Sequence, residues 1–242
     1  MCGRYATART SSHLLDDFHA TLTDAARHVV VDYNVAPTRA PLVVGRPAAD
    51  AGRERLLVSA VWGLLPGWAR DRSGAGRLIN ARVETVEEKP SFREAFARRR
   101  AVVPMDGYYE WWQPPDEGFG KPPRQPYFVT ARTPDGGGRG IGVAGLYEFW
   151  RPPGEPSAPL LATFTILTTA AEGEDGRLHD RAPLLVPEEG LDDWLAPEPA
   201  PREELLGLLR PATPGRLNAW PVGPAVGNVR HNGPELVRPL AE

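Results

Sequence analysis

The sequence has little cysteine, little net charge and no long apolar run. Its single cysteine, Cys2, excludes an internal disulfide and a cysteine-rich zinc site, and we expect neither a metal nor a cofactor. No stretch approaches the ~18 consecutive apolar residues of a membrane-spanning helix, and no basic-then-apolar leader is present, so we expect a cytoplasmic protein with no membrane partner. A net charge of −3 argues against a surface coated with basic residues, but it permits a local basic groove.

The length and composition fit one globular domain. With 242 residues, 41% hydrophobic and 24% charged, the chain can bury a core of its own. Runs rich in β-branched and aromatic residues outnumber helical ones, which predicts a single α+β domain over residues 1–242 with mainly antiparallel strands. Expected strands lie at 29–31, 42–44, 55–64, 102–112, 127–131, 141–150 and 160–169, with a late run ending near 229. Expected helices lie at 11–19 with a serine cap, at 92–99 capped by Ser91, at 188–195 and at 202–209.

Three segments rich in proline and glycine interrupt the strands, at 113–126, 134–140 and 151–159. Strand-like sequence resumes directly on both sides of each, so they are expected to be exposed hairpin loops or insertions and not linkers between domains. An irregular loop at 65–76 carries Trp68, whose ring could stack on a nucleic-acid base.

Cys2 directly follows the initiator methionine. A small second residue generally permits removal of Met1, which would leave Cys2 with a free α-amine and a thiol on adjacent carbons. With reference pKa values of about 7.7–8.0 and about 8.5, both groups are partly nucleophilic near neutral pH. The amine can form a Schiff base with an aldehyde, and the neighbouring sulfur can then close a five-membered thiazolidine. Taken alone, a single cysteine is more often an inert small hydrophobic residue.

Three further segments carry polar side chains that strand packing does not require. Asn80 and Arg82 alternate with apolar residues, and taken alone this segment fits a solvent-facing strand edge followed by a helix start better than a functional site. Glu110 stands among aromatic residues; these would raise its carboxyl pKa and suit it to acid–base catalysis, or it is a satisfied structural carboxylate. His179, beside an aspartate and an arginine, has the side chain best suited to proton transfer near neutral pH, although a lone histidine is usually structural.

Taken together and in order, these segments resemble the SOS-response-associated peptidase (SRAP) family, the abasic-site processing proteins. Each piece is weak alone, but the ordered set begins at residue 2, extends over nearly the whole chain and is specific to the family. The matching pieces are MCGRY at 1–5, YNVAPT at 33–38, WGLLPGW at 62–68, NARVET at 80–85, VPMDGYYEW at 103–111, LTTAA at 167–171, HDRAP at 179–183 and AVGNV at 225–229.

The resemblance implies a compact domain with an antiparallel, β-barrel-like core, peripheral helices and the amino-terminal cysteine in a DNA-binding cleft. It also implies the reaction, which is covalent capture of abasic sites in single-stranded DNA through a thiazolidine between Cys2 and the sugar aldehyde. Cys2 matches the nucleophile, Asn80 the residue that positions it, and Glu110 and His179 the two acid–base residues. The implied DNA contacts are Arg4, Arg82 and Arg181 to phosphates, with Pro37, Trp68 and Thr168 as further contacts.

The same resemblance implies a DNA-damage protein whose partner is abasic single-stranded DNA, including sites at junctions with duplex. We expect a monomer that associates with the nucleoid when bound to DNA. A Schiff base at the sugar also permits strand scission by β-elimination, so weak lyase activity is expected beside autoproteolytic removal of Met1.

Two other functions stay open at this point. A cysteine peptidase could use Cys2 with His179, and would turn over a peptide in trans. A noncatalytic single-stranded DNA-binding module could use the arginines and Trp68, and would bind intact and abasic strands alike without a covalent product.

Overall fold

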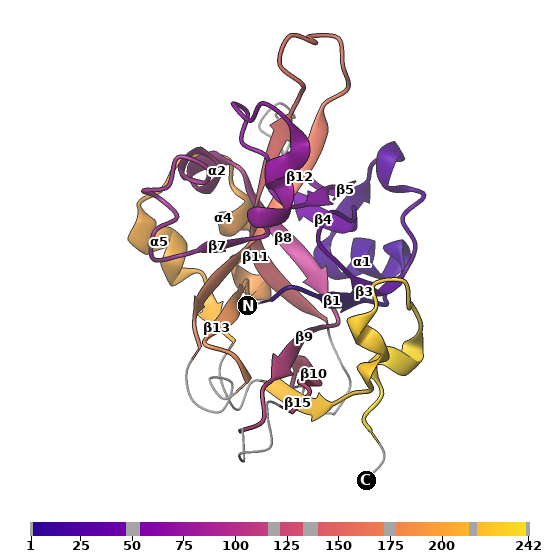
Figure 1. Ribbon diagram of the computed structural model, residues 1–242. Helices are drawn as coiled ribbons and strands as arrows, with labels where there is room; N and C mark the ends of the chain where they lie inside the picture. Colours follow the sequence, from indigo (N-terminus) through magenta and orange to yellow (C-terminus); the bar gives the residue numbers. More distant parts are fainter. Residues whose placement is uncertain are drawn as a thin grey trace.

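Strands make up most of the fold, and they form two sheets (Figure 1). The computed structural model describes residues 2–46, 54–115, 122–132, 140–171, 178–212 and 217–240. The first sheet is antiparallel and runs in the order β15 (Leu217–Pro221), β10 (Gln125–Ala131), β9 (Gly107–Trp112), β1 (Tyr5–Thr7) and β3 (Asp32–Val35).

The second sheet is larger and carries most of the core. Its order is β14 (Arg210–Pro211), β13 (Arg181–Leu185), β12 (Leu161–Ala170), β11 (Ile141–Trp150), β8 (Arg100–Met105), β4 (Leu42–Gly45), β5 (Arg55–Ser59) and β2 (Ala20–Leu22). Two short strands, β6 (Val61–Trp62) and β7 (Asn80–Arg82), pair with β12 in parallel. The α-helices of the described residues are α1 (Ser11–Phe18), α2 (Arg93–Arg98), α4 (Leu191–Leu195) and α5 (Arg202–Gly207).

This mixed, mainly antiparallel architecture confirms the expected fold class. The described strands form two separate sheets and no closed barrel, so the barrel-like core is not confirmed. No helix in the described ranges is long and apolar enough to cross a membrane.

The two sheets meet where β8 passes into β9. The sequence predicted one strand over 102–112, but the chain bends at Asp106 and changes sheet. The Asp106 carboxylate explains the bend, because it accepts hydrogen bonds from the backbone N–H groups of Ala8 and, at 3.2 Å, Arg9. Gly107 allows the close approach that follows, since a Cβ there would meet the Val129 carbonyl oxygen at 2.5 Å.

Several other boundaries differ from those expected. The first helix begins as predicted but its cap is Thr10, whose hydroxyl accepts from the His13 N–H, and not a serine. The second is shorter, with Phe92 at its N-cap and no side-chain cap bond, so Ser91 does not cap it. The helical run from 188 is split into a 3-10 turn η3 (Glu188–Gly190) and α4.

The remaining differences lie at strands. The run at 29–31 is a loop, and β3 begins only at Asp32. The late strand ends at Pro221, so the residues before 229 form a 3-10 turn, η4 (Pro224–Gly227), instead of a strand. β1 and β13 were not predicted, because three residues are too few for a pattern and β13 contains a proline.

The loop at 151–159 joins β11 to β12 and projects beyond the sheet, which confirms the expected hairpin loop (Figure 1). The loop expected at 134–140 lies outside the described residues except for Gly140. Of the loop at 113–126, only residues 113–115 and 122–126 are described.

The carboxyl-terminal segment is fastened to the first sheet by Asn34. Figure 1 shows this segment, in yellow, lying beside β3. Asn34 is buried, and its Nδ2 donates to the carbonyl oxygens of Val226 (3.3 Å), Asn228 (3.1 Å) and His231 (2.9 Å). Its Oδ1 accepts from the Arg4 guanidinium at 2.7 Å. One side chain therefore joins the beginning of the chain to its end.

Asn34→Ala is expected to lower the free energy of unfolding by about 2–4 kcal/mol, because buried carbonyl groups and a guanidinium lose their partner at once. Urea unfolding measures the effect. Asn218→Ala, an exposed asparagine on β15, is the matched control and should change stability little. Equal effects of the two substitutions would contradict this account of the fold.

Candidate active site

The beginning of the chain lies between β7 and β9. The Cys2 carbonyl oxygen accepts a hydrogen bond from Asn80 Nδ2 at 2.8 Å, and the Arg4 carbonyl oxygen accepts one from the Tyr109 N–H at 2.9 Å. Cys2 is fully buried, in an apolar cluster with Tyr5 and Trp62. Met1 lies outside the described residues. The Asn80 side chain therefore holds the backbone of Cys2 in place.

Burial decides the protonation of the Cys2 thiol. It raises the thiol pKa far above its ordinary value, and the nearby Glu110 carboxylate raises it further. The thiol is therefore neutral at physiological pH, unlike the exposed aminothiol considered from the sequence. In this arrangement sulfur can attack only after its proton is taken up by another group.

Glu110 lies on β9, and its charge acts on the Cys2 thiol. Its side chain is 4% exposed, and burial raises the pKa of its carboxyl group to about 7. The Asp180 carboxylate also acts to raise this pKa. A carboxyl group that titrates near neutral pH can both give and take a proton, as the sequence analysis expected of it.

His179 lies just before β13 and is 32% exposed. Its Nδ1 accepts a hydrogen bond from the Arg181 N–H at 3.0 Å, while an Asp180 carboxylate oxygen also lies 2.6 Å from Nδ1. The two contacts demand different protonation states, because Nδ1 cannot accept from Arg181 and donate to Asp180 together. Burial lowers the His179 pKa, so the neutral ring with its proton on Nε2 fits best.

Strand pairing brings Asn80 and the His179 segment to the same part of the second sheet. β7 and β13 both pair with β12, and Thr168 of β12 has Arg82 and Pro183 as its Cα partners. Asn80 Oδ1 is buried and has no hydrogen-bond partner among the described residues. It is an acceptor free for a donor that enters the site.

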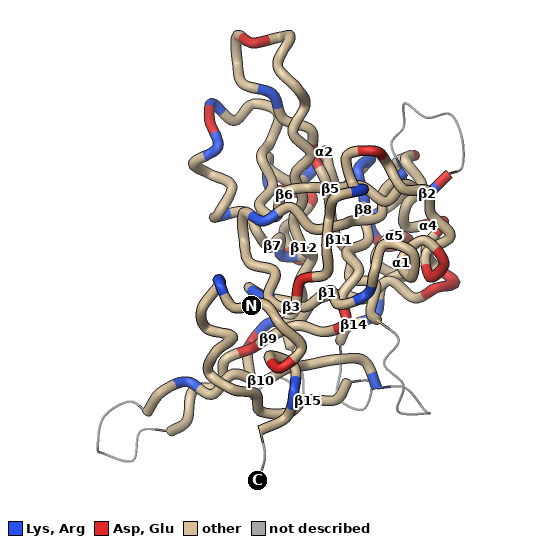
Figure 2. Tube along the Cα trace, turned by 90° about the vertical axis from the view of Figure 1, so that its right-hand side faces the viewer, with Lys and Arg blue, Asp and Glu red and all other residues tan. Residues whose placement is uncertain are grey.

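The three arginines expected to bind phosphate differ in what already holds them. Arg4 donates to Asn34 and, at 2.8 Å, to the Val226 carbonyl oxygen, and lies over the Trp111 ring. Arg181 donates with both terminal nitrogens to Glu84. Arg82 is exposed and forms no ion pair among the described residues. Figure 2 shows basic and acidic residues interspersed along the trace, in keeping with the small net charge.

The other expected DNA contacts also differ in exposure. Trp68 is 67% exposed, so its ring is open to a stacking partner. Pro37 is half-buried and precedes Thr38, whose φ of 71° is unusual for a β-branched residue. Thr168 is buried, and its hydroxyl lies 3.4 Å from the Ala81 carbonyl oxygen, so a direct contact with DNA would require it to be uncovered.

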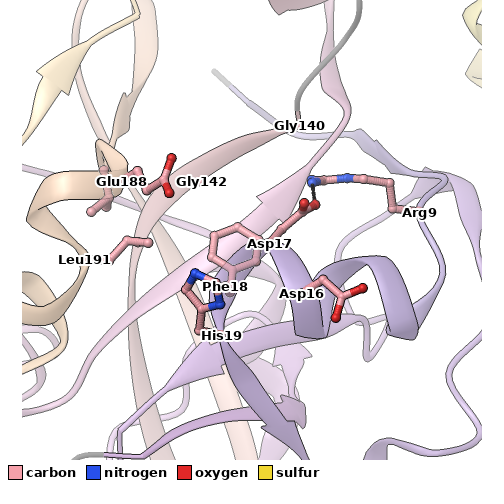
Figure 3. Close-up of a pocket in the computed structure, with 10 residues that line it drawn as sticks. Arg9, Asp16, Asp17, Phe18, His19, Gly140, Gly142, Glu188 and Leu191 are labelled. Carbon is pink, nitrogen blue, oxygen red and sulfur yellow. Dashed lines mark hydrogen bonds and ion pairs between the residues drawn. The ribbon is translucent and has the colours of Figure 1, made fainter.

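A separate hollow lies beside α1 (Figure 3). It has a volume of about 260 Å³ and contains none of the expected site residues. Three carboxylates line it, and one of them pairs with Arg9, which disfavours a phosphate group there. Within the described ranges, no group of three or more His, Cys, Asp or Glu side chains is placed to hold a metal ion.

Glu84, Asp180 and Asn34 were not predicted as site residues. Glu84 and Asp180 adjoin expected site residues in the sequence, so their proximity was visible but their partners were not. Asn34 stands in one of the matching segments, yet its bonds to residues 226–231 join parts of the chain far apart in sequence.

Comparison with known proteins gives matches over nearly the whole chain. The family model described as "SOS response associated peptidase (SRAP)" matches residues 1–229. "Abasic site processing protein YoqW" of Bacillus subtilis (strain 168) is 31% identical over 239 residues, covering 98% of this chain and 99% of the relative. "Abasic site processing protein YedK" of Escherichia coli (strain K12) is 31% identical over 248 residues, covering 99% and 100%. A crystal structure of a Bacteroides thetaiotaomicron protein, 22% identical, matches the fold with a TM-score of 0.82 over 99% and 100% of the two chains.

Proposed function

The chain belongs to the SOS response associated peptidase (SRAP) family, and from that membership we propose that it captures abasic sites in single-stranded DNA through its amino-terminal cysteine. Hydrolysis of the Met1–Cys2 peptide bond consumes one water and frees the α-amine. The amine attacks the aldehyde carbon of the opened sugar and water leaves, which forms an imine. The sulfur then adds to the imine carbon, the thiol proton passes to the nitrogen, and a thiazolidine results.

The observation that carries this proposal is the arrangement around Cys2. A hydrogen bond from Asn80 holds its carbonyl oxygen, and the carboxyl group of Glu110, which titrates near neutral pH, acts on its thiol. An abasic sugar is mostly a closed hemiacetal, so a proton donor is needed to open it, and a proton acceptor is needed when the buried thiol reacts. Glu110 can serve in both roles, and a neutral His179 can assist by donating a hydrogen bond from Nε2.

Arg82 and Trp68 are the proposed direct DNA contacts with the most open side chains. Pro37, next to the unusual backbone at Thr38, would border the strand beside them. Arg4, Arg181 and Thr168 already have partners within the protein, so in this proposal they contact DNA only where a phosphate adds to or replaces those partners.

Two further activities follow from the same intermediate and the same residue. The imine permits β-elimination at the sugar, which would cleave the strand before the sulfur closes the ring. Removal of Met1 by the protein itself would be the peptidase activity of the family description. A peptidase acting on other chains through Cys2 and His179 is the alternative function.

Intact mass spectrometry before and after incubation with an abasic single-stranded oligonucleotide tests the proposal. We expect a chain without Met1 that gains the mass of the oligonucleotide minus one water. An equal mass gain with an intact oligonucleotide, or no covalent mass gain at all, would refute the proposal. Turnover of a peptide that is lost in Cys2→Ser would favour the alternative.

A further inference from the structure

Glu84 and Arg181 form a two-point ion pair at the edge of the proposed DNA site. Arg181 Nη1 and Nη2 each lie 2.8 Å from one of the two Glu84 carboxylate oxygens. The Arg181 side chain is 12% exposed and that of Glu84 is 45% exposed. The hydrogen bonds from Arg181 lower the Glu84 pKa, so this carboxyl group is ionised at neutral pH.

The pair leaves Arg181 few donors for a phosphate. Beyond the two bonds to Glu84, Nη2 also donates to the Thr168 carbonyl oxygen at 2.6 Å. Nε is buried without a partner among the described residues. A phosphate that approaches Arg181 must therefore compete with a carboxylate already in the favoured geometry, and the pair as a whole carries no net charge.

Glu84 also stands close in the sequence to Arg82, which forms no ion pair among the described residues. It follows the exposed Arg82 by two residues, and Arg82 and Arg181 lie on β7 and β13, the strands that pair with β12 at Thr168 and Ala170. A DNA strand held by Arg82 would pass the half-exposed Glu84 carboxylate. Repulsion between that carboxylate and phosphate weakens binding of any strand, damaged or not.

We infer that Glu84 determines specificity by keeping Arg181 neutralised, so that intact single-stranded DNA binds weakly and retention depends on the covalent bond. The inference rests on the proposed function. In this inference Glu84 weakens DNA binding. If Glu84 only held Arg181 in position for DNA, it would instead strengthen binding through Arg181.

A double-mutant cycle on noncovalent binding tests this inference. Affinity for an intact single-stranded oligonucleotide is measured over a range of salt concentrations for wild type, Glu84→Gln, Arg181→Gln and the double variant. Glutamine keeps an acceptor for Arg181, so the fold is preserved. Glu84→Gln should raise affinity several-fold and steepen the slope of log affinity against log salt by about 0.7, the value for one more phosphate contact on a single strand.

Arg181→Gln alone should leave affinity nearly unchanged, because Arg181 is already neutralised, yet it should cancel the gain in the Glu84→Gln background. Glu87→Gln is the matched control. It removes the same charge three residues away, where the carboxylate lies 4.0 Å from Arg202 and is 60% exposed, and it should have a much smaller effect.

Three results would overturn the inference. Glu84→Gln could weaken binding of the intact strand, or it could change affinity no more than Glu87→Gln does. Arg181→Gln could also lower affinity as much in the wild-type background as it does in the Glu84→Gln background. The proposed function fails differently, as absence of the covalent product with abasic DNA whatever the cycle gives. A protein that binds no intact strand in any of these forms but still forms the covalent product would overturn the inference and leave the proposed function standing.

Discussion

Cys2→Ala is expected to abolish the adduct with abasic single-stranded DNA that survives denaturation. Alanine keeps the α-amine, so the imine can still form, but without sulfur the thiazolidine cannot close. The imine then hydrolyses or proceeds to β-elimination. On a denaturing gel, the shifted band should vanish and cleaved oligonucleotide should persist or increase.

Borohydride separates the two halves of this reaction. It reduces an imine to a stable amine, so it should trap the Cys2→Ala variant on abasic DNA although no spontaneous adduct forms. Intact mass shows whether the variant has lost Met1, because a retained Met1 would block the amine itself. A spontaneous, denaturation-resistant adduct in a Cys2→Ala chain that lacks Met1 would refute the role of the sulfur.

The second large effect is expected from Glu110→Gln. Glutamine has nearly the same shape but cannot exchange a proton, so the rate of adduct formation should fall about 100-fold or more, as for other lost acid–base groups. In wild type the rate should rise with pH as the α-amine, of reference pKa about 7.7–8.0, loses its proton. It should fall again as Glu110, with its pKa raised to about 7, loses the proton that opens the sugar.

The pH profile therefore distinguishes Glu110 from a merely structural carboxylate. Wild type should show a bell-shaped rate, and Glu110→Gln should keep only the arm that rises with the amine. Single-turnover rates from pH 5 to pH 9 measure both. A Glu110→Gln variant that keeps the full bell-shaped profile at a lower rate would show that the alkaline arm belongs to another group.

The pH dependence of stability tests whether the Glu110→Gln variant is folded. Because burial raises the Glu110 pKa, the folded state binds its proton more tightly than the unfolded state, and stability is lost as pH rises from about 4.5 through about 7. The full shift corresponds to about 3 kcal/mol at pH 8. Glu110→Gln should remove this dependence and melt no lower than wild type at pH 8, so its slow reaction would not reflect unfolding.

The sequence pointed to candidate site residues and indicated less about which groups hold them. Cys2 and Asn80 were expected together, and the 2.8 Å bond between them brings two residues 78 positions apart into contact. Glu110 was expected to have a raised pKa from its aromatic neighbours, and burial is its largest cause. These expectations rest on local composition and ordered motifs, which the sequence displays directly.

The arginines show the limit of that reasoning. Arg4 and Arg181 were expected to meet phosphate, but their guanidinium groups are bound by Asn34, the Val226 carbonyl and Glu84, which lie 30, 222 and 97 residues away. Free and paired arginines look alike in a motif. Only the folded arrangement separates them from Arg82.

The bend at Asp106 shows a second limit. The run from 102 to 112 is rich in strand-forming residues, and its Asp106-Gly107 pair does not by itself reveal a change of sheet. The cause is a carboxylate that binds the backbone after β1, together with a glycine that admits β10. Asp106 and Gly107 form a short local pattern, and their structural role depends on strands that are distant in the sequence.

The hydrogen bonds from Arg4 and Asn34 to residues 226–231 limit where the chain can be shortened. An expression clone trimmed after residue 223 would retain every residue proposed to react, yet Arg4, two positions from the reactive amine, would lose the Val226 carbonyl that anchors it. Truncation at the far end of the polypeptide would thus disturb the residues at its beginning, even though no atom from that end takes part in the proposed bond making.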